Sequence, residues 1–144
     1  MKADVMVLVV LGLAGSLGTA GCAYHNPATG AEATYAFHAL YSEVDAPLPV
    51  VYTAALKAAD DLDLTVGRAV EGAFGAQVRA VDDLGNVVTI HLKPLAREQT
   101  GLRINLGLSG SRWKSIRVFN SIMANLAESR PTVAASTTQA DGPE

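Results

Sequence analysis

The chain has 144 residues, of which 49% are hydrophobic and 17% charged, and its formal net charge is −3. This length predicts one domain, and the apolar fraction is too high for a disordered protein. The acidic balance argues against nucleic-acid binding, which needs a basic face to neutralise phosphates. A single cysteine excludes a disulfide framework and any metal site built from several cysteines.

The first segment has the layout of a secretory signal peptide. The 19 residues from Val5 to Ala23 include no charged residue, and Lys57 is the first basic residue after Lys2. An apolar run, VMVLVVLGL, precedes small and weakly polar residues, which is the order found in export signals. An uncleaved membrane helix is the alternative, because this length just suffices to span a bilayer. Four glycines in its second half favour cleavage over a stable span.

The single cysteine lies where this signal ends. The run Thr19-Ala20-Gly21-Cys22 resembles the lipobox of bacterial lipoproteins, in which small residues precede a cysteine. The resemblance implies cleavage between Gly21 and Cys22 and a diacylglycerol on the Cys22 thiol. Thr19 departs from the pattern, where leucine is commonest, and an ordinary cut after Ala20 with a free thiol is the alternative. Ala23, where an aspartate would favour the inner membrane, leads us to expect the periplasmic face of the outer membrane.

Three further segments follow the predicted signal peptide of residues 1–21. Residues 22–33 contain Asn-Pro and Thr-Gly turn pairs without an apolar period, so we expect a flexible tether. Residues 131–144 have the composition of a disordered tail. The folded domain is therefore expected over residues 34–130, a length that can bury one modest core.

Hydrophobic periodicity predicts the elements of this domain. A half-buried strand is expected to carry Tyr35, Phe37, Ala39 and Tyr41 on its apolar positions. A helix with prolines in its first turn is expected from Pro47 to Leu62. Four strands linked by hairpins follow it, and one of the hairpin turns is expected at residues 82–86. The last strand alternates through Leu102, Ile104, Leu106 and Leu108. Ser111 caps a final helix. Its apolar stripe comprises Trp113, Ile116, Phe119, Ile122, Met123 and Leu126.

The order β-α-β-β-β-β-α predicts an α+β two-layer sandwich. We expect a five-stranded antiparallel sheet with one open face and two antiparallel helices on the other. Counting strand directions allows the first strand to pair with the fifth. The same count puts the end of the first helix near the start of the second, so the carboxylates of Asp60–Asp63 are expected within about 10 Å of Arg112 or Lys114.

Three stretches carry structural signatures of caps, turns and strand alternation. They are the turn and helix from Asp45 to Val66, the strand VTIHLKPL from Val88 to Leu95, and RINLG from Arg103 to Gly107. Together they resemble the DUF3568 family of small bacterial lipoproteins, whose function is unknown, over about residues 34–126. The layout is also loosely similar to a reduced helix-grip domain. These resemblances imply a fold and carry no mechanism.

The residue patterns do not indicate an enzyme. No Gly-x-Ser-x-Gly, His-Glu-x-x-His or P-loop pattern occurs in the sequence. His25 lies on the expected tether, while His38 and His91 lie on different strands with no carboxylate at metal-ligand spacing. We therefore expect no catalytic residue, no metal site and no cofactor.

The outward face of the predicted sheet is mildly basic on an acidic chain. It is expected to carry Arg79, His91, Lys93 and Arg103. Such a face could meet anionic lipid head groups or an acidic protein, or it could be merely solvated. These observations favour a lipid-anchored envelope protein with a non-catalytic structural or partner-binding role. The alternative is a periplasmic carrier of a small ligand or lipid with a helix-grip-like cavity, against which the thin predicted core argues.

Overall fold

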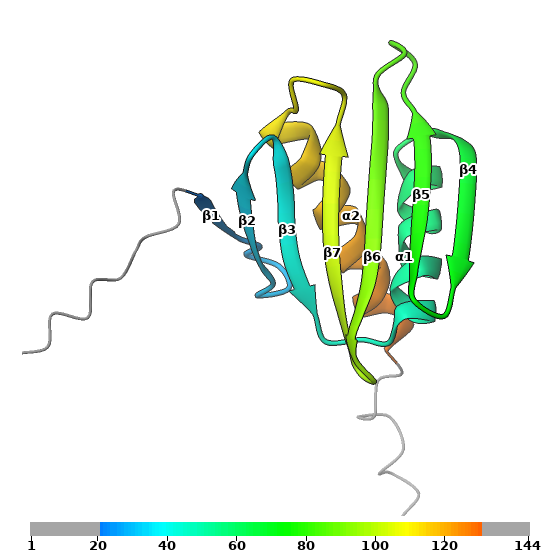
Figure 1. Cartoon of the computed structure of the whole chain (residues 1–144). Coiled ribbons are helices and arrows are strands. Elements are labelled where there is room, and N and C mark those ends of the chain that lie inside the picture. Colours follow the sequence, from blue (N-terminus) through cyan, green and yellow to red (C-terminus); the bar gives the residue numbers. More distant parts are fainter. Residues whose placement is uncertain (1–20, 131–144) are drawn as a thin grey trace, which may run out of the picture.

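The computed structural model describes residues 21–130, so the predicted signal peptide up to residue 20 and the predicted tail lie outside the described residues. Seven strands form one antiparallel sheet, and two helices lie together on one face of it (Figure 1). The strands are β1 (Cys22–His25), β2 (Glu32–Ala36), β3 (Ala39–Val44), β4 (Thr65–Gly72), β5 (Gly75–Val81), β6 (Val87–Ala96) and β7 (Gln99–Leu106). The helices are α1 (Leu48–Asp61) and α2 (Arg112–Ser129). The sheet order is β1-β2-β3-β7-β6-β5-β4, which confirms the two-layer α+β architecture.

The central strands of the sheet run in the directions predicted from the sequence. β3, which contains the end of the first predicted strand, pairs antiparallel with β7, and Leu40 lies opposite Ile104. The helices run in opposite directions, with Lys57 of α1 beside Glu128 near the end of α2. Side chains from both layers fill the space between sheet and helices. The largest fully buried apolar ones are Phe119, Leu40, Ile90, Ile104, Ile122, Val51, Val78 and Val88.

The sheet has seven strands instead of five partly because the expected tether of residues 22–33 is paired structure. β1 and the start of β2 form a hairpin in which Cys22 lies opposite Tyr35. The buried side chain of Asn26 closes its turn, because Asn26 Oδ1 accepts two backbone N–H groups of the turn, at 2.8 and 3.2 Å. Asn26 Nδ2 also donates to Asn120 Oδ1 of α2 at 2.9 Å, which fastens the hairpin to the helix layer.

The other additional strand arises because the expected strand of residues 35–41 turns back on itself. Phe37 and His38 have φ angles of 49° and 62° and link β2 to β3 in a two-residue hairpin. Such turns usually carry Asn and Gly, so the sequence has no signal for this one. The reversal points Tyr35 toward the core and Tyr41 toward the open face, and it leaves Phe37 89% exposed at the tip.

The predicted proximity of Asp60–Asp63 to the start of α2 is wrong for Asp61. Asp61 accepts a hydrogen bond from Asn125, in the last turns of α2. Lys114 lies 11 residues earlier in α2, roughly 16 Å along the helix axis, and pairs with Asp82 at 3.0 Å. Strand directions fix the end of the sheet at which a helix begins, but not the strands it covers. α1 lies mainly on β4, β5 and β6 and reaches β7, whereas α2 lies on β3 and β7.

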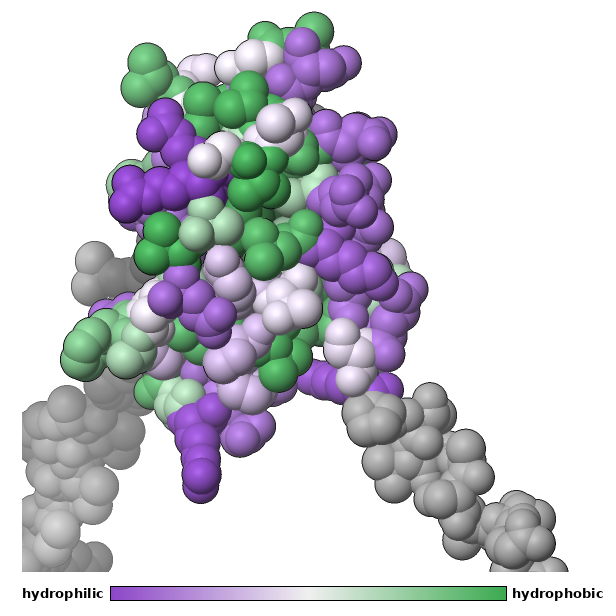
Figure 2. Space-filling model, turned by 90° about the vertical axis from the view of Figure 1, so that its right-hand side faces the viewer, coloured by the Kyte–Doolittle hydropathy of each residue, from purple (hydrophilic) through white to green (hydrophobic). Residues whose placement is uncertain are grey.

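β4 forms one edge of the sheet and is exposed along its whole length. Figure 2, which views the molecule from this side, shows a band of apolar side chains between hydrophilic margins. Val66 and Val70 contribute exposed apolar surface there. A register shift between Val66 and Arg68 interrupts the pairing with β5. Such an irregularity makes an edge a poor template for a further strand.

Candidate functional site

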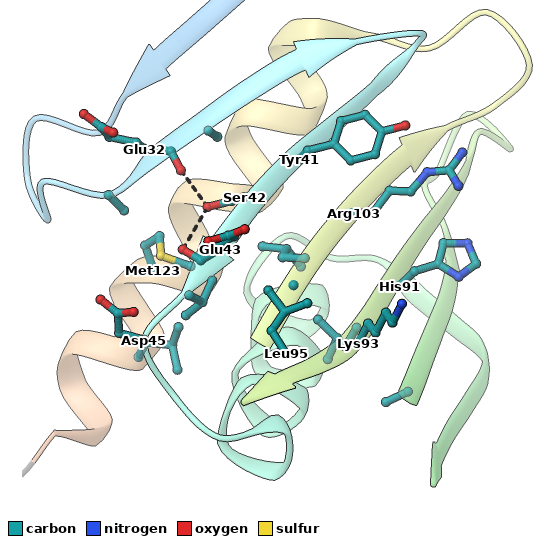
Figure 3. Close-up of a pocket in the computed structure, with 18 of the residues that line it drawn as sticks. Glu32, Tyr41, Ser42, Glu43, Asp45, His91, Lys93, Leu95, Arg103 and Met123 are labelled. Atoms are coloured by element: carbon teal, nitrogen blue, oxygen red, sulfur yellow. Dashed lines mark hydrogen bonds between the residues drawn. The ribbon is translucent and has the colours of Figure 1, made fainter. Parts of the chain in front are cut away.

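The face of the sheet opposite the helices is open and basic. His91 and Lys93 of β6 and Arg103 of β7 project from this open face (Figure 3). Arg79 of β5 lies opposite Thr89 of β6 and so faces the same way. Strand pairing places His91 directly opposite Arg103. The open face therefore gathers the four residues that the alternation of the sequence assigns to it.

β4 adds Arg68, a cation that the sequence reasoning did not include. Arg68 lies opposite Arg79 and so faces the same way. Gly72 and Gly75 are paired across the β4–β5 turn, and counting back from this turn brings Arg68 level with Arg79. The hairpin alone could therefore have identified this residue.

Tyr41 and Glu43 of β3 complete the open face on the side away from β4. The Arg103 guanidinium carbon lies 5.7 Å from the centre of the Tyr41 ring, a cation–π arrangement that holds the arginine over the sheet. Burial, and secondarily the charge of Arg103, lower the pKa of His91 below its ordinary value of 6.5. His91 is thus neutral at neutral pH, and the positive charge of the face comes from the arginines and Lys93.

A broad groove of about 1420 Å³ runs along this face. Arg68, Lys93 and Arg103 line it on the sheet, and Glu32 and Glu43 line it near β2 and β3. The groove lies on the open face and continues past the lower end of β3. At that end Met123, Leu126 and Ala127 of α2 line it as well, whereas the rest of its lining belongs mainly to the outer side of the sheet and not to the space between sheet and helices that a helix-grip carrier would use.

The histidines of the described chain lie apart from one another. His25 Nδ1 is 3.8 Å from Glu32 Oε1 in an exposed pair, His38 lies in the β2–β3 turn, and His91 lies on β6. Among residues 21–130, no three His, Cys, Asp or Glu side chains gather where they could hold a metal ion. Nor does that part of the chain contain a helix long and apolar enough to cross a membrane.

Cys22, the predicted lipid attachment point, is an exposed free cysteine and the first residue of β1. It therefore lies on the edge strand opposite to β4. A side chain at the preceding Gly21 would overlap Thr34 of β2.

These observations define a small two-layer α+β domain with a basic, open sheet face. The chain belongs to the DUF3568 family, described as a protein of unknown function, whose model matches residues 4–125. No curated protein matches the chain. CalU16 from Micromonospora echinospora, an NMR structure, is similar over 90% of this chain and 87% of its own, with 12% identity and a TM-score of 0.42. A likeness this distant indicates no function.

Proposed function

We propose that this protein is a lipid-anchored component of the bacterial cell envelope that binds an acidic protein partner through the open face of its sheet. The observation that carries the anchor is the position of Cys22. The only cysteine of the chain follows an apolar leader and small residues, and it is exposed. Cleavage between Gly21 and Cys22 would leave a diacylglycerol on the thiol, and acylation of the new amino group would add another chain. Two or more chains hold a protein stably on a membrane, where one binds marginally.

Charge distribution supports binding at the open face. Four of the 11 basic residues, Arg68, Arg79, Lys93 and Arg103, lie on this one face of an acidic chain. Cations gathered on one surface create a local positive potential that attracts and orients an acidic partner. The role we propose is therefore binding rather than catalysis, at the periplasmic face of the outer membrane. The groove lies mainly on the outer side of the sheet and only its end reaches α2, which favours a binding face over the carrier alternative.

The anchor is tested by the intact mass of the mature protein. We expect an N-terminal peptide that begins at Cys22 and carries two or three acyl chains, and we expect Cys22→Ser to accumulate as an unlipidated precursor. A mature chain cut after Ala20 with an unmodified thiol would refute the anchor.

The binding face is tested by crosslinking in intact envelopes, followed by a pull-down of this protein. The open-face variant changes Arg79, Lys93 and Arg103 to alanine. Because exposed charge pairs contribute up to about 1 kcal/mol each, we expect roughly ten-fold weaker recovery of the partner. Added salt should weaken recovery with the unaltered protein in the same direction.

A control variant removes the same charge from elsewhere on the domain. Its substitutions are Arg97→Ala, Arg112→Ala and Arg117→Ala, all at exposed positions outside the open face. Equal losses for the two variants would indicate a non-specific charge effect and would contradict binding at the open face. Binding of the open face to anionic vesicles without any crosslinked protein would replace the acidic protein by a lipid head group.

A further inference from the structure

Three large apolar side chains that periodicity assigns to the buried side of elements are exposed. Phe37, Leu108 and Trp113 retain 89%, 104% and 77% of their accessible surface. They lie in the β2–β3 turn, in the loop after β7 and in the first turn of α2, all at the upper end of the domain in Figure 1. Positions where a regular pattern fails in this way are often functional.

Packing around Gly110 brings these three residues to one place. Gly110 has a φ of +67°, and a Cβ on it would lie 2.5 Å from Tyr35 Oη and 2.8 Å from the His38 carbonyl oxygen. The β7–α2 loop is therefore pressed against the β2–β3 turn. Leu108 is two residues before this contact and Trp113 three residues after it, while Phe37 is next to His38.

A fourth exposed apolar residue lies at the same end. Leu84 is 78% exposed in the β5–β6 turn, and this turn is tied to α2 by the ion pair between Asp82 and Lys114. Figure 2 has the same vertical axis and shows apolar side chains at the upper extremity. We call Phe37, Leu84, Leu108 and Trp113 the apical patch.

The predicted lipid attachment point lies at this end too. Cys22 is opposite Tyr35 in the β1–β2 pairing, and Tyr35 is the residue whose hydroxyl packs against the loop at Gly110. An acyl chain on Cys22 would thus enter the bilayer beside the apical patch. Phe74 is 94% exposed as well, but it lies in the β4–β5 turn at the other end of the sheet, away from Cys22.

The charges around the apical patch offset one another. Arg112 and Lys114 stand beside Trp113, while Asp82 and Asp83 are in the turn that carries Leu84. Attraction to this end therefore depends on apolar contact rather than on net charge. A tryptophan ring, with an apolar body and one N–H donor, suits the boundary between lipid head groups and acyl chains.

Phe37 has no local structural reason to be in its turn. A two-residue hairpin with positive φ at both positions favours Asn and Gly, and a bulky side chain there is strained. Neither folding stability nor core packing calls for a phenylalanine at this tip. A phenylalanine at this tip is explained instead by contact with something outside the domain.

We propose that the apical patch docks on the lipid bilayer that holds the Cys22 anchor. The inference rests on the proposed function for the anchor and adds an orientation to it. The strands then stand upright on the membrane, and the open face looks sideways along it, accessible to a partner. Docking by apolar side chains is insensitive to salt, unlike binding at the open face.

Trp113 is the only tryptophan of the chain, so its fluorescence reports on the patch directly. The mature protein, purified from membranes, is reconstituted in phosphatidylcholine vesicles with and without brominated acyl chains. We expect a blue-shifted Trp113 emission that the brominated lipid quenches, at low and at high salt. An unshifted, unquenched Trp113 in the anchored protein would overturn the proposal.

Two variants and a control separate docking from folding. Burial of one large apolar side chain corresponds to roughly a ten-fold change in an equilibrium constant, so Phe37→Asn and Leu108→Ser should each lower the docking constant about ten-fold. Phe37→Asn should leave the melting temperature unchanged or raise it, because asparagine suits the turn. Phe74→Ser, at the opposite end, should leave quenching unchanged.

Other outcomes overturn the proposal as clearly. Equal quenching in all three variants would refute docking through this patch. Shielding of Trp113 without lipid, together with concentration-dependent sedimentation, would assign the patch to a second copy of the chain. The intact mass of the mature protein shows separately whether the anchor is present. A chain without lipid on Cys22 is titrated with the same vesicles, and Trp113 quenching then measures docking by itself.

Discussion

Replacement of Asn120 by alanine should release β1 from the rest of the sheet. Asn120 Oδ1 accepts hydrogen bonds from Asn26 Nδ2 at 2.9 Å and from the Tyr24 hydroxyl at 3.1 Å. Its Nδ2 donates to Tyr24 Oη at 2.9 Å. Asn26 is only 4% exposed, so its amide cannot exchange the lost partner for bulk water.

The magnitude follows from these contacts. Each lost hydrogen bond costs about 1 kcal/mol net, and a buried donor left without a partner costs about 1–3 kcal/mol more. The bonds share groups, so the costs do not simply add, and we expect a total of about 3 kcal/mol. β1 has only four residues, and one contact of Tyr24 survives, its edge-to-face packing on Phe119. The loss should therefore open the hairpin locally and leave the core folded.

Hydrogen exchange measured by mass spectrometry distinguishes local from global opening. In Asn120→Ala, amides of residues 22–36 should lose protection while those of β6 and β7 keep it. Arg117→Ala, an exposed substitution on the same helix, serves as the control. Unchanged protection of β1 in Asn120→Ala would refute the assignment of Asn120 as its fastener, and a uniform loss across the domain would refute the local nature of the effect.

Three further predictions concern turns and titrating groups. Gly110→Ala should lower the free energy of unfolding in urea by about 2 kcal/mol, because a Cβ at positive φ is strained and would overlap its neighbours. A hydrogen bond from Asn86 is the main cause that lowers the pKa of Asp82 from 3.8 to about 2, so stability from this carboxylate is complete above pH 3.8 and is lost as the pH falls toward 2. Asn86→Ala should raise the pKa of Asp82, which a carbon NMR titration of its carboxyl group measures. Arg103→Ala should raise the pKa of His91 part of the way toward 6.5, and the unaltered domain should lose stability as the pH falls below 6.5.

Elements with a regular local period were predictable from the sequence. α1 begins where prolines suit a first helical turn, Ser111 caps α2 through its hydrogen bond from the Lys114 backbone N–H, and residues 82–86 form the expected hairpin turn. Period-two alternation along β5, β6 and β7 assigned the open-face cations correctly to one side. These features depend on neighbouring residues, which the sequence displays directly.

What the sequence could not reveal depends on distant residues or on where an element ends. The pairing of β1 needs Asn120, 94 positions after Asn26. The β2–β3 turn uses Phe37 and His38, which carry no turn signal, so a hairpin resembled a single strand. Leu108 continues the period of β7 beyond its last paired residue. A hydrophobic period does not show where hydrogen bonding stops, so periodicity predicts a buried Leu108 where the structure has an exposed one.

If Cys22 carries the proposed anchor, the pairing of β1 also shortens the connection between the membrane and the domain. A flexible linker of residues 22–33 would have a root-mean-square end-to-end distance of about 19 Å. The distance between the domain and its attachment point would then vary over that range. Because Cys22 is part of the sheet, the lipid that we propose for its thiol would be attached to the folded body itself. The open face would then stay closer to the bilayer than it would on a flexible linker. In the proposed arrangement, a partner held at the same membrane would meet the open face at a higher effective concentration than a partner free in solution.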